Sequence, residues 1–89
     1  KYKCLFKIKD NEEIILALEQ IECDILNYVN IKGKIMRYNI SNHLRSGTIN
    51  IYNNYKIKHR KDEFIIKISG VWITEHEYGL TYKVLDIPM

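Results

Sequence analysis

The chain of 89 residues is poor in the residues that build metal sites and disulfide frameworks. It holds two cysteines, Cys4 and Cys23, without a CxxC motif or a histidine beside either of them. A structural metal needs three or four converging ligands, and that pattern is missing. Two thiols in a reducing compartment are favoured over a Cys4–Cys23 disulfide. We therefore expect no metal, and an intracellular rather than a secreted protein.

Long hydrophobic runs are missing as well. No stretch approaches the roughly 18 apolar residues that cross a membrane, and no signal peptide is visible at the start. We therefore expect no membrane partner. The hydrophobic content of 46 % and the charged content of 28 % are typical of a globular chain, and the length suits one small domain, 1–89. Because residue 1 is Lys rather than Met, we expect this domain to be part of a longer chain.

Motifs for cofactor binding and catalysis are a further absence. Neither the GxGxxG fingerprint of dinucleotide binding nor a P-loop occurs in the sequence. The three histidines are His43, His59 and His76. None of them can be paired in the sequence with a Ser or Cys nucleophile and an orienting acid. We expect a protein that is not an enzyme and that uses no cofactor.

Basic residues are absent from one long segment. Residues 11–30 contain five acidic side chains and no Lys or Arg. The rest of the chain holds all 14 basic side chains against six acidic ones. An acidic segment beside a basic remainder favours a polyanionic partner on one side of the molecule. The alternative is that lysine serves only as a solvated surface residue.

The acidic segment has the pattern of a helix. Asp10 and Glu13 have the spacing of a capping box, and the apolar periodicity predicts a helix over 11–29. The stripe that we expect to be buried comprises Ile14, Leu18, Ile21, Ile25 and Tyr28. The polar residues away from that stripe are Glu12, Glu19, Glu22 and Asn27. We expect the helix to cover a sheet, and the alternative is an amphipathic helix that binds a partner.

Alternation with period 2 predicts strands elsewhere. Residues 1–9 alternate with four lysines on one side, residues 48–52 alternate as well, and 35–38 predict a short strand. Residues 39–47 form either a turn or a single helical turn. Residues 64–68 and 80–84, joined by a short polar segment, predict an antiparallel pair. The expected class is α+β, with a small and largely antiparallel sheet of about five strands.

Trp72 follows the first strand of this pair, and two interpretations of it remain open. Strict alternation places Trp72 on the side of Phe64, in the core. A β-bulge near Gly70 would instead turn Trp72 to the side of Lys67. On the second strand, Tyr82 alternates with its neighbour Lys83, which favours Tyr82 as the core residue of the two.

Aromatic side chains are interleaved with basic ones in the second half of the chain. Single-stranded nucleic acid is held by cations along its backbone and by rings that stack on its bases. The residues that we expect to contact phosphates are Lys56, Lys58, Arg60, Lys61, Lys67 and Lys83. The residues that we expect to stack on bases are Trp72, Tyr52 and Tyr82. Packing in the core is the alternative for each of these rings.

These features together resemble virus- and phage-encoded single-stranded-DNA-binding proteins with an oligonucleotide/oligosaccharide-binding (OB) barrel. The matching segments are KCLFKIK at 3–9, the helix at 11–29 and GVWITEHEYGLTYKVLDI at 70–87. The part that most resembles small proteins of nucleocytoplasmic large DNA viruses is residues 64–87. The resemblance implies an OB-like sheet, single-stranded DNA as the ligand, and a place in the host cell, the viral replication compartment or the virion.

The expected function is therefore the non-catalytic binding of single-stranded nucleic acid, with DNA as the form that the resemblance implies. The alternative is a structural subunit of a viral particle or complex. Such a subunit would dock on a protein partner, or on a second copy of itself, through the helix or a sheet edge. A nucleic-acid binder should expose aromatic rings beside cations, whereas a docking subunit should expose an apolar patch.

Overall fold

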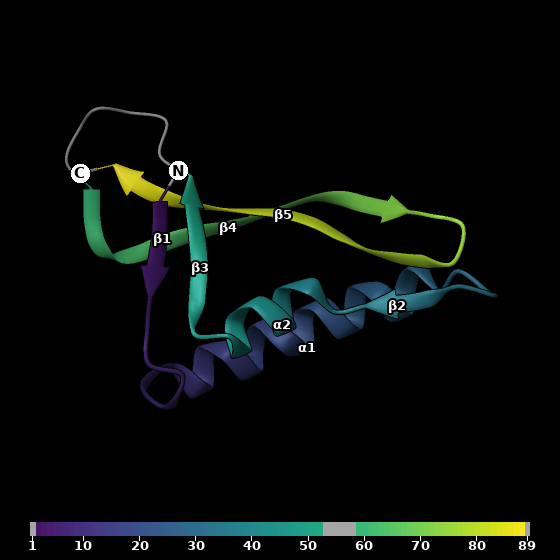
Figure 1. Ribbon diagram of the computed structural model, residues 1–89, viewed down its shortest axis with the longest axis horizontal. Coiled ribbons are helices and arrows are strands. Elements are labelled where there is room, and N and C mark those ends of the chain that lie inside the picture. The colour runs from purple at the N-terminus through teal and green to yellow at the C-terminus, as the bar shows by residue number, and fades with distance from the viewer. Residues whose placement is uncertain (1, 53–58, 89) are drawn as a thin grey trace.

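The computed structural model describes the backbone of residues 2–52 and 59–88, and within these the side chains of residues 3–52 and 64–85. The predicted α+β class, the long helix and the number of strands are confirmed (Figure 1). In chain order the elements are β1 (Tyr2–Leu5), the 3-10 helix η1 (Lys9–Asn11), α1 (Glu12–Val29), β2 (Ile35–Arg37), α2 (Asn39–Arg45), β3 (Thr48–Tyr52), β4 (His59–Ile73) and β5 (Glu77–Pro88). The open segment at 39–47 thus contains a short helix.

The sheet is organised around β5. One edge of β5 pairs with β4 in an antiparallel hairpin that runs above both helices in Figure 1. The other edge pairs in parallel with β2 at residues 77–79 and with β3 at residues 84–85. Strand β1 lies antiparallel to β3 at the margin of the sheet. The sheet is therefore mixed, and its antiparallel pairs are the longer ones.

A β-bulge interrupts the hairpin. Ile68 lies opposite Tyr82, but the next pair along β5 is Gly70 with Thr81, so Ser69 has no counterpart on β5. One extra residue on one strand reverses the side on which every following side chain lies. Of the two alternatives for this strand, the β-bulge near Gly70 is thus confirmed.

The bulge places Trp72 opposite Gly79, on the side of the hairpin that also carries Lys67, Thr81 and Lys83. Residues directly opposite each other in an antiparallel pair share a face. We call this side the outer face, because the other side of β5 is covered by the helices. The expectation of strict alternation, with Trp72 in the core, is wrong because the extra residue inverts the pattern.

The core lies between the inner face of β5 and the two helices. Its buried residues are Ile15 and Leu26 of α1, Ile40 and Leu44 of α2, and Tyr78 and Leu80 of β5. The Tyr78 hydroxyl donates to the carbonyl of Leu26 at 3.3 Å and accepts from the backbone N–H of Ile31 at 3.3 Å. These two bonds tie the start of β5 to the end of α1. A buried tyrosine hydroxyl normally has such partners.

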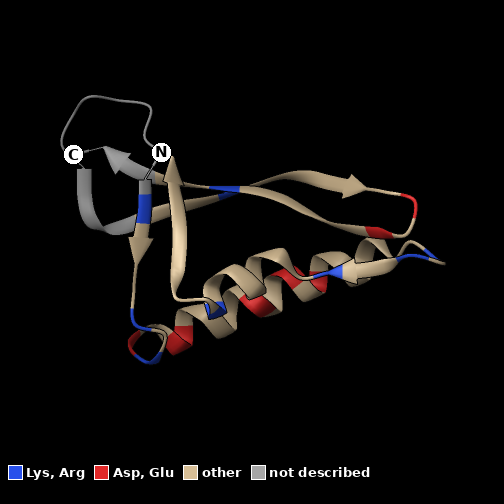
Figure 2. Ribbon diagram, viewed as in Figure 1, with Lys and Arg blue, Asp and Glu red and all other residues tan. Residues whose placement is uncertain are grey.

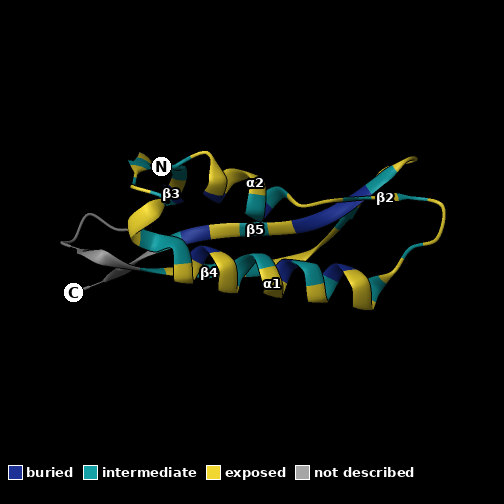
Figure 3. Cartoon of the chain, turned by 90° about the horizontal axis from the view of Figure 1, so that it is seen from below, coloured by how far each residue is buried: buried dark blue, intermediate teal, exposed yellow. Residues whose placement is uncertain are grey.

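The face that α1 buries matches the predicted stripe only in part, because Leu18 and Ile25 pack against the core but are only partly buried. Ile15 and Leu26 are buried, whereas Ile14 is 62 %, Ile21 45 % and Tyr28 90 % exposed. Figure 3 shows the exposed and buried positions alternating along the helix. Apolar residues cover a wide arc of α1, and α2 packs on one flank of that arc rather than on its middle. The expectation that Ile21 lies in the core is therefore wrong.

Glu22 explains why α1 turns a different face to the core than the one that the periodicity predicts. It was expected away from the buried stripe, yet its side chain is fully buried. Its carboxylate accepts hydrogen bonds from the backbone N–H of Ile40 at 2.8 Å, the N–H of Ser41 at 2.9 Å and the Ser41 hydroxyl at 2.6 Å. The first amides of a helix need acceptors, and Tyr38 before α2 supplies no side-chain cap. Glu22 of α1 therefore caps α2 and fixes the packing of the two helices.

Candidate nucleic-acid interface

Two lysines face each other in the middle of the outer face. Lys67 of β4 lies directly opposite Lys83 of β5, and both side chains are exposed. Figure 2 shows basic segments midway along this hairpin. Favourable cross-strand pairs contribute about 0.2–1 kcal/mol to a sheet, whereas like charges in directly opposed positions destabilise it. Within the described residues, neither lysine forms an ion pair that would offset this repulsion. The pair is therefore a concentrated positive charge that nothing in the described structure neutralises.

Tyr52 lies beside this lysine pair. It is the last residue of β3 and lies next to Leu85 of β5, which is on the same side of the sheet as Lys83. The Nζ atom of Lys83 is 5.2 Å from the centre of the Tyr52 ring, within the range of a cation–π contact. This contact holds a ring and a cation together at one end of the outer face.

Trp72 marks the other end of the outer face. Its ring lies against Gly79, since a Cβ atom added at Gly79 would be 2.7 Å from the ring carbon Cζ2 of Trp72 and 3.0 Å from the carbonyl oxygen of Arg37. Only glycine leaves room for the indole at this position. Trp72 is half-buried. On the neighbouring strand β2, Arg37 lies beside Gly79 and forms an ion pair with Glu77.

The outer face therefore carries its candidate ligand-binding side chains in a row. From Gly79, which Trp72 covers, to Leu85, beside Tyr52, β5 advances about 20 Å at about 3.4 Å per residue. The two lysines lie between these ends. Among the described residues the outer face has no cluster of aromatic rings: Trp72 and Tyr52 are separate platforms with cations between them.

Tyr82 lies on the inner face, as its alternation with Lys83 indicates. Its hydroxyl is hydrogen-bonded to Nδ1 of His43 in α2, and the two rings are 5.8 Å apart. Burial, with a smaller contribution from the negative charge of Glu22, raises the pKa of Tyr82 to about 12. The hydroxyl is therefore protonated at neutral pH, and the ring is not available on the outer face beside Trp72.

The predicted cluster at residues 56–61 is described only in part. Lys56 and Lys58 lie outside the described residues. Arg60 and Lys61 belong to the backbone of β4, but their side chains lie outside the described part of the structure. The contribution of these four residues to binding stays a prediction.

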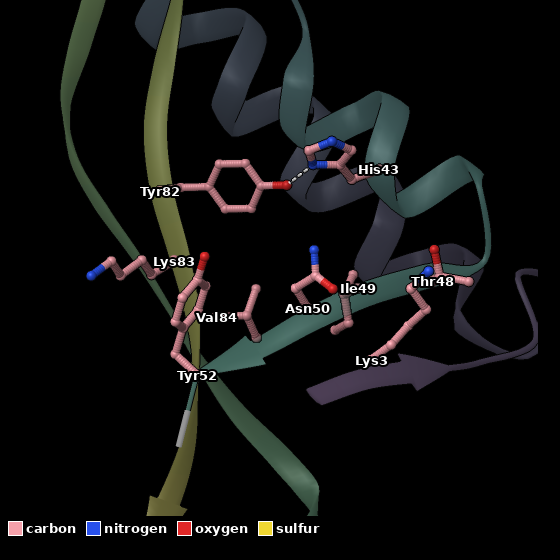
Figure 4. Close-up of a pocket in the computed structure, with 9 residues that line it drawn as sticks. All are labelled: Lys3, His43, Thr48, Ile49, Asn50, Tyr52, Tyr82, Lys83 and Val84. Carbon is pink, nitrogen blue, oxygen red and sulfur yellow. Dashed lines mark hydrogen bonds between the residues drawn. The ribbon is translucent and has the colours of Figure 1, made fainter. Parts of the chain in front are cut away.

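A pocket of about 230 Å³ lies where β5 has no neighbour on one edge. The pairing with β2 ends at Gly79 and the pairing with β3 begins at Val84. We call the pocket between them the fork pocket (Figure 4). It is lined by Lys3, His43, Thr48, Ile49, Asn50, Tyr52, Tyr82, Lys83 and Val84. Three of these, Tyr52, Tyr82 and Lys83, are among the binding residues predicted from the sequence, and the other six are not.

A second cavity lies between the inner face of the sheet and α1, and it shares Ile49 and Val84 with the fork pocket. It has a volume of about 410 Å³, and its lining is mostly apolar, with Phe6, Ile14 and Leu18 facing Phe64 and Ile66 of β4. We call it the apolar groove. The half-exposed flank of α1 that begins at Ile14 forms one of its rims.

The remaining observations concern other classes of site. Among residues with described side chains, no three His, Cys, Asp or Glu converge as metal ligands would. In the described part of the chain, neither helix combines the length and the apolar character needed to cross a lipid bilayer. Comparisons of the chain with models of protein families, with characterised proteins and with solved structures gave no match. The resemblance to viral OB-barrel proteins therefore stays a prediction.

Proposed function

We propose that the protein binds single-stranded nucleic acid, without catalysis, along the outer face of the β4–β5 hairpin. The observation that carries this proposal is the opposition of Lys67 and Lys83. A sheet gains nothing from two cations held face to face, and a phosphate between them converts their repulsion into two attractive contacts. The fold thus maintains a position that an anion stabilises.

Stacking on the flanking rings favours a nucleic acid over other polyanions. Trp72 and Tyr52 lie at the two ends of the lysine pair and present ring surface on the same side of the sheet. Each base that stacks on an aromatic ring contributes about 1–3 kcal/mol to binding. Bases of a duplex are already stacked on each other, so this arrangement favours single strands. DNA, and a setting in an infected cell or a virion, follow from the resemblance to viral proteins.

The test is a titration followed by tryptophan fluorescence, because Trp72 is the only Trp. The probe is an oligothymidine of about 12 nucleotides, within the 4–16 that one OB fold occupies. We expect quenching of the emission, and a log affinity that falls with log salt by about 0.7 per phosphate neutralised. Absence of binding at low salt would refute the proposal.

A matched pair of variants locates the binding. The double variant Lys67→Gln with Lys83→Gln should lower both the affinity and the salt slope. The control is Lys32→Gln, an exposed lysine in the turn before β2, which should leave both unchanged. Equal losses in the two variants would indicate non-specific attraction to the whole molecule rather than binding at the outer face.

One observation favours the second function, docking of a protein partner. Ile14, Ile21 and Tyr28 are exposed along α1, and Ile14 continues into the apolar groove. Exposed apolar surface beside a groove is typical of protein interfaces. The substitution Ile21→Glu should abolish self-association in sedimentation if a second copy docks there, and it should leave oligothymidine binding unchanged. A protein that sediments as a monomer in both forms would exclude the homo-oligomer.

A further inference from the structure

The fork pocket has the position and the polarity to hold one base of a strand bound at the outer face. Tyr52 and Lys83 belong both to the outer face and to the lining of the pocket. A strand that passes over these two residues therefore passes the mouth of the pocket. The volume of the fork pocket is about 230 Å³, below the roughly 300–1,000 Å³ of pockets for drug-sized ligands. A pocket of this size suits a small planar group.

The lining supplies both apolar and polar contacts. Ile49 and Val84 line the pocket, and the hydrogen-bonded pair of Tyr82 and His43 closes one end. Figure 4 shows the side-chain amide of Asn50 extending from β3 toward that pair. Asn50 is exposed, and within the described residues its amide makes no hydrogen bond. The NH2 donor and the carbonyl acceptor of the Asn50 amide therefore lie next to each other in the pocket, without a hydrogen-bond partner among the described residues.

We infer that the fork pocket holds one adenine, splayed out of the bound strand, and that Asn50 recognises it. The inference rests on the proposed function and adds a base preference at one position. An asparagine amide forms two hydrogen bonds with adenine, accepting from the N6 amino group and donating to a ring nitrogen. The ring nitrogen in this pairing is N7, because on the edge that carries N7 no other base offers a donor beside an acceptor. Lys3 and Lys83, which also line the pocket, then supply cations for the adjoining phosphates.

The experiment compares four oligonucleotides of about 12 nucleotides, oligothymidine alone and with a central dA, dC or dG. Because a thymidine strand can bind in several registers, a single substituted base can reach the pocket. We expect the strand with dA to bind about tenfold more tightly than the other three. Asn50→Ala should remove this difference, so that the strand with dA binds no more tightly than the other three. Asn42→Ala, an exposed asparagine of α2 outside the pocket, should keep it.

The outcomes separate this inference from the function on which it rests. Oligothymidine that binds with the expected salt dependence, but with no gain from dA, would overturn the adenine pocket alone. A preference for another base, or one that Asn50→Ala retains, would overturn it as well. If no oligonucleotide binds at low salt, both proposals fail. Thermal unfolding by circular dichroism of each variant checks that the fold is retained.

Discussion

The two long elements of the molecule, α1 and the β4–β5 hairpin, differ in whether their charged side chains have partners within the fold. On α1, Glu12 and Glu19 are both hydrogen-bonded to Arg45, and Glu22 is buried against the amides of α2. On the hairpin, Lys67 and Lys83 oppose each other without an acidic partner in the described structure. Figure 2 shows the contrast, with acidic segments along α1 and basic ones midway along the hairpin. Three acidic side chains of α1 thus have partners within the fold, whereas the two lysines have no acidic partner in the described structure.

The sharpest test of the structural role on α1 is Glu22→Ala. The substitution leaves the buried amide of Ile40 and the partly buried amide of Ser41 without an acceptor. Each unsatisfied amide costs about 1–3 kcal/mol, and the hydrogen bonds to the charged group are lost as well. We expect the free energy of unfolding in urea to fall by about 3 kcal/mol or more. For a small domain this is a large part of the total stability.

The control for Glu22 is Glu13→Ala, which removes an exposed carboxylate from the first turn of the same helix. Only a favourable interaction with the helix dipole is lost there, about 0.3–1 kcal/mol. A Glu22→Ala protein that is no less stable than the control would contradict the capping of α2 by this side chain.

Ile15→Ala and Ile21→Ala compare the two flanks of α1 directly. Ile15 is 1 % exposed in the core, so its truncation should cost about 2–5 kcal/mol. Ile21 is 45 % exposed, so its truncation should lower the free energy of unfolding by less than about 1 kcal/mol. Chemical denaturation of both variants measures the difference. Equal losses would show that the helix is rotated in solution toward the face that the periodicity predicts.

The contrast between Ile15 and Ile21 also shows where the sequence is informative. A strand offers two faces, so alternation at Leu80–Val84 and one bulge near Gly70 leave only two arrangements of the hairpin. The helix has apolar residues over so wide an arc that Ile14 and Ile15 are equally plausible core residues. The choice between them depends on α2, whose position relative to α1 is a long-range contact that no local pattern contains.

The difference between local patterns and long-range contacts also explains which residues of the candidate site the sequence predicts and which it does not. Trp72, Lys67 and Lys83 lie on one hairpin, and alternation with a bulge places them on one face. Asn50 and His43 reach the fork pocket from β3 and α2, and no local pattern links either residue to β5. The sequence places Glu22 away from the buried stripe, and a carboxylate is seldom buried without a partner. Its partners are backbone amides, which carry no sequence signature.

Trp72→Ala tests the proposed ligand-binding role of the hairpin. Loss of the stacking surface should weaken oligothymidine binding by about 1–3 kcal/mol. The effect on stability should be smaller than the 3–5 kcal/mol typical of a core tryptophan, because Trp72 is half-buried on the outer face. Fluorescence anisotropy of a labelled oligonucleotide measures binding without the intrinsic probe. Tyr28→Ala, which removes a 90 % exposed ring from α1, should leave the affinity unchanged. An equal loss of affinity in both variants would contradict the stacking of a base on Trp72.

Lys67→Gln should have effects of opposite sign on stability and on binding. Removing one of two opposed cations should raise the free energy of unfolding by about 0.2–1 kcal/mol, while the affinity for oligothymidine falls. Added salt should reduce the gain in stability, because screening weakens the repulsion in the wild-type protein. A variant that is less stable and binds equally well would show that Lys67 serves the fold and not a ligand.

The smallest effect is expected at Arg45, where the acidic charges of α1 are neutralised at the surface. Arg45 donates two hydrogen bonds to Glu19, at 2.9 and 2.8 Å, and others to Glu12. Hydrogen bonding from this guanidinium lowers the pKa of Glu19, and burial opposes the shift only in part. A carboxylate whose pKa is lowered in the folded state contributes stability above the pKa that it has in the unfolded chain. That contribution is lost as the pH falls through the lower, folded value.

Arg45→Gln should therefore lower the melting temperature at neutral pH by only about 1–2 °C, since exposed ion pairs contribute little. The difference from the wild-type protein should shrink as the pH is reduced below the ordinary range of a glutamate, because protonated Glu19 no longer gains from the guanidinium. Glu19→Gln should reproduce this pH dependence, whereas Lys32→Gln, remote from the pair, should lack it. A difference between Arg45→Gln and the wild-type protein that stays constant down to acidic pH would mean that Arg45 acts through packing of its aliphatic stem.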